Sequence, residues 1–164
     1  MAADLDAKKM SEAKIMYGTL CSSLDNRKWT YNKDDDGLIV RTSAVGNDLT
    51  IKLLIKVDAS RSVMYLKSPL PFTVTASNKN DVIKAVTIAN WAMLNGSFEM
   101  DVDEGYVGFK AVVPFMDSII SEQLCKYLID MSCRMVDTFN DKLVAVANGS
   151  MSVAEFAEFA KKAL

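Results

Sequence analysis

The chain has 164 residues, of which 50% are hydrophobic and 24% charged, and its formal net charge is −2. It contains no histidine, which excludes catalytic triads built on histidine and metal sites with histidine ligands. No basic block that would suit a nucleic acid stands out, and no apolar run approaches the ~20 residues of a membrane span. We therefore predict one domain over residues 1–164 with neither nucleic acid nor membrane as its partner. The first ten residues lack the apolar region of a signal peptide, which favours a cytoplasmic protein.

Three cysteines, Cys21, Cys125 and Cys133, are widely spaced in the chain and form no CxxC pair. Cys125 and Cys133 are separated by about 12 Å along a predicted helix, which is too far for a disulfide. We expect all three to be buried free thiols.

The first third of the chain predicts a helix followed by antiparallel strands. A helical stripe that includes Ile15 covers residues 10–24, and two short strands then meet at an Asp-Gly turn near Gly37. Residues 49–57 alternate between apolar and polar side chains, and only Leu54 breaks the polar face. This alternation predicts a strand that buries one face.

A fourth strand is predicted up to Lys67, where Pro69 and Pro71 should end regular pairing because proline cannot donate to a ladder. A helix follows over residues 80–95, with Asn78 as its expected N-cap. Its apolar stripe is broad, so this helix should be largely buried. Gly96 is expected to terminate it in the left-handed conformation.

The stretch FEMDVDEGYVGFK, residues 98–110, predicts a β-hairpin. Its apolar sets share a face only if the loop holds an even number of residues, and residues 103–106 fit with Gly105 at positive φ. A calcium loop starting at Asp101 is disfavoured, because its glycine falls at position 5 and its twelfth residue is Val112. The carboxylates of this stretch should be solvated and not catalytic.

Two helices complete the predicted order. The first covers residues 118–147, and its row of Glu122, Lys126, Asp130 and Arg134 alternates in sign, which indicates a solvated face. The last begins at Ser152, which forms a capping box with Glu155.

Three residues are candidates for special roles. Asn90 lies within an apolar helix, where its amide is expected to satisfy the backbone of a neighbouring loop, with ligand binding as the alternative. Trp91 belongs either to the core or to an exposed contact patch, and Leu54 stands on the polar side of its strand. Leu54 and Trp91 are therefore the candidate contact residues. The sequence offers no P-loop or dinucleotide fingerprint, and we assign no catalytic, cofactor-binding or metal-binding residue and no cofactor.

The segment TIANWAMLNGSFEMDVDEGYVGFKAVVPF, together with WTYNKDDDGLIV, resembles the YbjN family, described as "putative bacterial sensory transduction regulators". The resemblance covers roughly residues 11–149. It implies the α+β fold of type III secretion chaperones, an α-β(3)-α-β(2)-α sandwich with helices on one face of an antiparallel sheet, here with an extra C-terminal helix. It also implies binding or regulation without catalysis, and often a homodimer.

We therefore expect a non-enzymatic regulatory or chaperone-like domain of bacterial type that binds a protein partner, whose identity the sequence does not name. The alternative is a small-ligand sensor or an enzyme with a pocket between sheet and helices. Ligands that raise the melting temperature would favour the alternative, whereas co-purification of one polypeptide would favour protein binding.

We predict that calcium does not bind specifically, because neither the loop from Asp101 nor the acidic loop from Asp34, whose twelfth residue is Val45, completes the ligand set. Calorimetric titration at physiological salt should show no saturable site. A micromolar site that involves Asp101 or Asp103 would contradict the hairpin.

Overall fold

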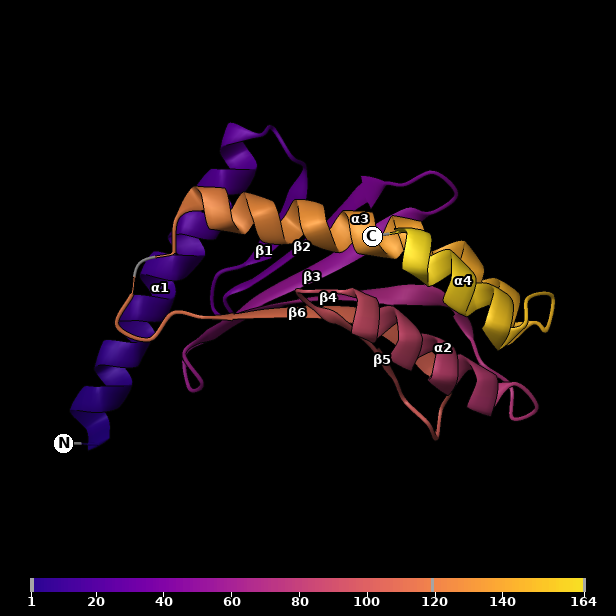
Figure 1. Ribbon diagram of the computed structural model, residues 1–164. Coiled ribbons are helices and arrows are strands. Elements are labelled where there is room, and N and C mark those ends of the chain that lie inside the picture. The colour runs from indigo at the N-terminus through magenta and orange to yellow at the C-terminus, as the bar shows by residue number, and fades with distance from the viewer. Residues whose placement is uncertain (1, 119, 164) are drawn as a thin grey trace.

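The computed structural model describes residues 2–118 and 120–163, which form helices and one antiparallel sheet (Figure 1). In chain order the elements are α1 (Ala2–Asn26), β1 (Tyr31–Asp34), β2 (Ile39–Val45), β3 (Thr50–Asp58), β4 (Val63–Thr73), α2 (Lys79–Ala92), β5 (Ser97–Met100), β6 (Tyr106–Pro114), α3 (Glu122–Ala147) and α4 (Val153–Ala163). The predicted α+β class is confirmed, with four strands in the meander that precedes α2.

The six strands of the sheet follow the order β1-β2-β3-β4-β6-β5, and every neighbouring pair is antiparallel. Strand β3 shows why the layers form: Ile51, Leu53, Ile55 and Val57 are buried, whereas the residues between them point the other way. Because side chains alternate along a strand, one face of the sheet is apolar and must be covered. The helices lie on that face (Figure 1), and we call the opposite face the outer face.

Aromatic rings tie the C-terminal helices to the sheet. The Phe98 ring of β5 lies 5.2 Å from Phe109 of β6 and 5.7 Å from Phe139 of α3, both edge-on. Phe139 in turn lies 6.1 Å from Phe156 of α4, which is fully buried. Helix α4 is therefore part of the core, and its Ser152–Glu155 capping box is confirmed by hydrogen bonds in both directions.

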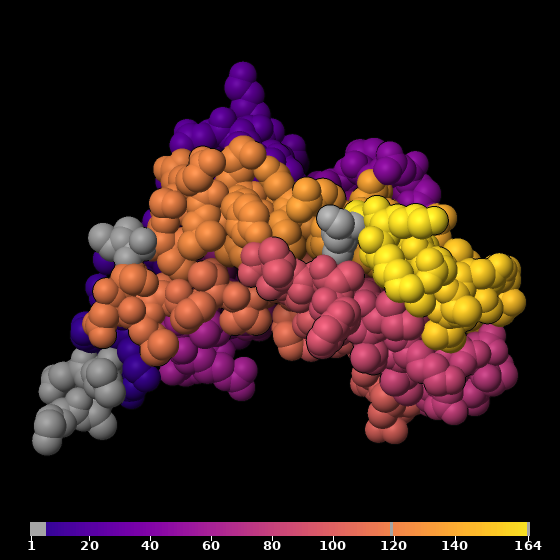
Figure 2. Space-filling view, viewed as in Figure 1, coloured from indigo at the N-terminus to yellow at the C-terminus, as the bar shows by residue number. Residues whose placement is uncertain are grey.

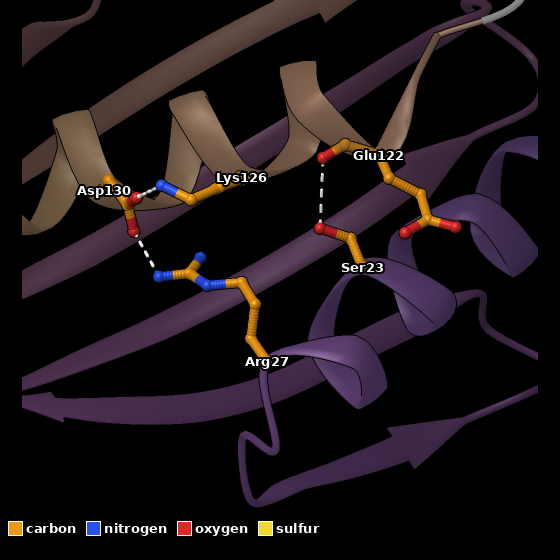
Figure 3. A network of polar contacts seen from close by, with 5 residues as sticks. All are labelled: Ser23, Arg27, Glu122, Lys126 and Asp130. Carbon is orange, nitrogen blue, oxygen red and sulfur yellow. Dashed lines mark hydrogen bonds and ion pairs between the residues drawn. The ribbon is translucent and has the colours of Figure 1, made fainter.

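Helices α1 and α3 are joined by a polar network (Figure 3). Ser23 donates to the backbone carbonyl of Glu122, and Arg27 and Lys126 both donate to the carboxylate of Asp130. Burial acts to raise the pKa of Asp130, but these two hydrogen bonds hold it below its usual value. The prediction that this row of α3 is fully solvated is therefore wrong at Asp130, whose carboxylate binds Arg27 at the end of α1.

Strand β4 continues through both of its prolines, so the predicted break after Lys67 is wrong. The ladder with β3 ends at the pair Leu54–Lys67, whereas pairing with β6 goes on through Pro69–Gly108 to Thr73–Tyr106, with an irregularity between. Beyond Lys67 the strand has a partner on one side only. The absent N–H of a proline is therefore tolerated on the side where β4 has no neighbouring strand.

Local signals at three helices were also misread. The side chain of Asn78 makes no cap hydrogen bond, because its amide donates to the carbonyl of Ala147 at 2.9 Å. Helix α3 begins at Glu122 with Ser121 as its N-cap, later than predicted. Ile15, which we counted in the helical stripe of α1, is 61% exposed and does not share the burial of Leu20 and Leu24.

The β5–β6 hairpin is confirmed, with a register shifted from the predicted one. Met100 pairs with Val107, and Asp101 donates its N–H to the Tyr106 carbonyl. The loop between paired residues is even, as the apolar pattern requires, but it starts earlier in the chain. Gly105 has φ +77°, as predicted.

We predict that Gly105→Val lowers the free energy of unfolding by at least about 2 kcal/mol, because a β-branched residue is strained at positive φ. An added Cβ would also clash with the carbonyl oxygen of Val74. Urea denaturation measures the loss. Gly18→Ala in α1 is the control: its Cβ meets no atom within 4 Å, so stability should rise by about 0.5–1 kcal/mol. A Gly105→Val variant as stable as the parent chain would contradict the backbone assignment.

Candidate functional site

The side-chain amide of Asn90 fixes helix α2 to strand β5. Its Nδ2 donates to the carbonyl of Phe98 at 3.0 Å, and its Oδ1 accepts the N–H of Phe98 at 2.8 Å. Phe98 is buried, so both backbone groups would otherwise lack a partner. The structural role predicted for Asn90 is confirmed, although the backbone that it satisfies belongs to a strand and not to a loop.

Fixed in this way, α2 buries only one side. Its buried residues are Val82, Ala85, Val86 and Ala89. Just beyond them Trp91 is 93% exposed and Leu94 is 99% exposed. The prediction of a largely buried helix is wrong, and so is the core alternative for Trp91. Trp91 and Leu94 thus present two large apolar side chains to solvent at the C-terminal end of α2.

A groove of about 630 Å³ lies next to Trp91, between α2 and α4. Figure 2 shows the two helices side by side on this face of the molecule. The groove is lined mostly by small or apolar side chains: Thr87, Ile88, Trp91, Ala92, Ala157, Ala160 and Lys161. We call these residues together with Leu94 the α2–α4 surface.

Leu54, the second candidate, lies on the outer face of the sheet, and the structure does not bring it near Trp91. It is half-buried and stands in a cross-strand row with Arg41 of β2, Lys67 of β4 and Lys110 of β6. Next to it is a depression of about 560 Å³ at Gly108, which has no side chain. Leu54 therefore forms part of the wall of a hollow on an open, mainly basic surface.

The space between sheet and helices offers little room for a ligand. A cavity there, bounded by residues such as Leu20, Ile55 and Leu128, measures about 10 Å³. Binding sites for small molecules usually have volumes of 300–1,000 Å³. The interior is thus packed where the alternative function would need a pocket.

The described cysteine side chains are poorly suited to nucleophilic chemistry. Burial raises the pKa of Cys125 and of Cys133 to about 11, so at neutral pH both are protonated thiols and weak nucleophiles. Cys21 is also a free thiol but, like Cys133, only half-buried, so the expectation of three buried thiols is wrong for these two. Among the side chains of residues 6–118 and 120–163, no three gather as metal ligands would.

Two carboxylates of the hairpin, Glu99 and Asp101, have structural partners. Asp101 accepts the backbone N–H groups of Glu104 and Asp103, which lowers its pKa, and Glu99 pairs with Lys110.

None of the helices in the described part of the chain is both long and apolar enough to cross a bilayer.

Comparison with known proteins gives a family and a fold. The family model "YbjN: Putative bacterial sensory transduction regulator" matches residues 18–145. The solved structure "Crystal structure of YbjN, a putative transcription regulator from E. coli" is 13% identical, with a TM-score of 0.57, and the match covers 81% of this chain and 92% of that chain.

A second solved structure, "Structure of the HopA1-SchA Chaperone-Effector Complex", is also 13% identical, with a TM-score of 0.52, and the match covers 76% of this chain and 90% of that chain. Identities this low establish a shared fold and nothing finer. No curated protein sequence gives a significant match.

We predict that Asn90→Ala lowers the free energy of unfolding by roughly 2–4 kcal/mol, because it leaves the buried N–H and carbonyl of Phe98 unpaired. Asn95→Ala is the matched control, since it removes one exposed hydrogen bond to Tyr127 and should cost less than about 0.5 kcal/mol. Urea denaturation of both variants decides, and equal losses would show that the amide of Asn90 has no special role.

Proposed function

The chain belongs to the YbjN family, and from this premise we propose that it is a non-catalytic regulatory or chaperone-like domain that binds proteins. The observation that carries the proposal is the α2–α4 surface, where Trp91 is almost wholly in water beside a largely apolar groove and Leu94, just beyond α2, is equally exposed. Such a surface is typical of a site that another polypeptide covers.

Two further findings support this role over a small-ligand sensor or an enzyme. The fold is shared with a chain of a chaperone–effector complex, a protein assembly. The cavity of about 10 Å³ between sheet and helices would not admit a metabolite. A metabolite that raised the melting temperature at stoichiometric concentration would favour the alternative. Co-purification of one specific polypeptide from the native host would favour protein binding.

We further propose that a second copy of the chain occupies the α2–α4 surface and forms a homodimer. The protruding side chain, Trp91, and the groove that could receive it lie on the same surface. A surface that carries both parts is self-complementary across a two-fold axis, as an isologous interface requires. Small residues along the groove, among them Ala157 and Ala160, leave space for an indole ring.

We predict that light scattering after size exclusion gives about twice the single-chain mass of 18.1 kDa at micromolar concentration. Trp91→Ser with Leu94→Ser should shift the mass to that of one chain, because it removes the apolar area that association would bury. The matched control is Val45→Ser, since Val45 is 94% exposed but lies at the end of β2, away from this surface. It should leave the mass unchanged.

Tryptophan fluorescence gives an independent reading. In a Trp29→Phe background, Trp91 is the single tryptophan, and its emission should move to shorter wavelength as protein concentration rises and the ring leaves water. A parent chain that stays at 18.1 kDa, with emission independent of concentration, would rule out the homodimer and leave the surface for a different protein.

A further inference from the structure

The outer face of the sheet carries a concentration of positive charge that the sequence hides. Arg41, Lys67 and Lys110 come from three strands, yet they fall in one cross-strand row with Leu54. Lys52 and Lys56 flank Leu54 on the same side of β3. Neighbouring strands are about 4.8 Å apart, so these five side chains share one compact area.

Most of these cations have no anionic partner. Among the described residues, Arg41, Lys52, Lys56 and Lys67 take part in no ion pair, and only Lys110 is paired, with Glu99. The whole chain has a formal net charge of −2, so the positive area is local and does not reflect the overall composition.

This arrangement works against the isolated fold. Lys67 and Lys110 lie directly opposite each other in the β4–β6 ladder, and like charges in that position destabilise a sheet. A sheet face that no helix covers could remain in water equally well if its positive and negative side chains alternated. A cluster in which cations outnumber carboxylates is instead what an acidic partner needs for orientation and rapid association.

The depression at Gly108 adds a place for an apolar group. Its walls include Leu54, Pro69 and Tyr106, and its volume is about 560 Å³. Lys67 also lines it, so a bound chain could place a carboxylate on the cation and an apolar side chain two residues away in the hollow. In an extended segment, side chains two residues apart point to the same side, which allows both contacts.

We propose that the outer face binds an extended acidic polypeptide segment, with carboxylates on Arg41 and Lys67 and an apolar side chain in the depression at Gly108. This inference rests on the proposed protein-binding function and names the chemistry of the partner. The apolar walls of the depression, which include Leu54 and Pro69, favour a polypeptide with an apolar side chain over a nucleic acid.

The test uses a short dye-labelled peptide with the repeat Glu-Ser-Leu-Ser, which places glutamate and leucine on the same side of an extended chain, titrated with the full-length protein and followed by fluorescence anisotropy. We expect saturable binding that weakens with added salt, because charge attraction contributes to it. Arg41→Glu with Lys67→Glu should weaken binding by roughly tenfold or more, since two attractions become repulsions. Replacing leucine by alanine in the peptide should also weaken binding, since alanine would leave the hollow largely empty.

The control variant is Lys14→Glu with Lys28→Glu, which changes net charge equally at exposed positions outside the cross-strand row of Arg41 and Lys67 and should alter affinity by less than about twofold. Equal losses in both variants, no saturable binding, or tighter binding of a labelled oligothymidine would overturn the inference. Light scattering of Arg41→Glu with Lys67→Glu separates the two proposals: an intact dimer that no longer binds peptide locates the acidic site on the outer face. A monomeric parent chain that still binds the peptide would contradict only the homodimer.

Discussion

One-sided burial of the sheet is the constraint on which the rest of the structure depends. Each long strand directs alternate residues at the helices, and Phe98 and Phe109 carry that contact through Phe139 into α4. Because a single layer of helices satisfies the apolar face, the other face stays open, and the outward sides of α2 and α4 stay open as well. The two proposed contact surfaces are what remains when a two-layer fold has covered the one face that must be buried.

Local patterns were sufficient where neighbours in sequence decide the outcome. The alternation of residues 49–57, the capping box at Ser152 and the positive φ of Gly105 all depend on a few adjacent residues, and all three were predicted. Local patterns failed where a distant element intervenes. Asn78 is drawn away from the cap by the carbonyl of Ala147, and Pro69 is accepted because the β3 ladder ends before it.

The candidate contact residues were only partly predictable for the same reason. A helical stripe shows which side of α2 is apolar, but how much of that side α3 and α4 cover depends on where they pack, and here they leave Trp91 in water. The basic row on the outer face depends on register across several strands, which no single segment encodes. The one local sign of this basic row is Leu54, an apolar residue between lysines on the polar side of its strand.

The amide of Asn90 has a consequence for how the sheet ends. Strand β5 is an outermost strand, and the backbone groups that Asn90 occupies at Phe98 are those to which an additional strand would hydrogen-bond. At the opposite edge, β1 is four residues long, with Lys33 and Asp34 exposed. Short, charged or occupied edges prevent sheets of separate molecules from joining into fibrils. At the β5 edge, the side chain of Asn90 from α2 therefore blocks pairing with a strand of another molecule.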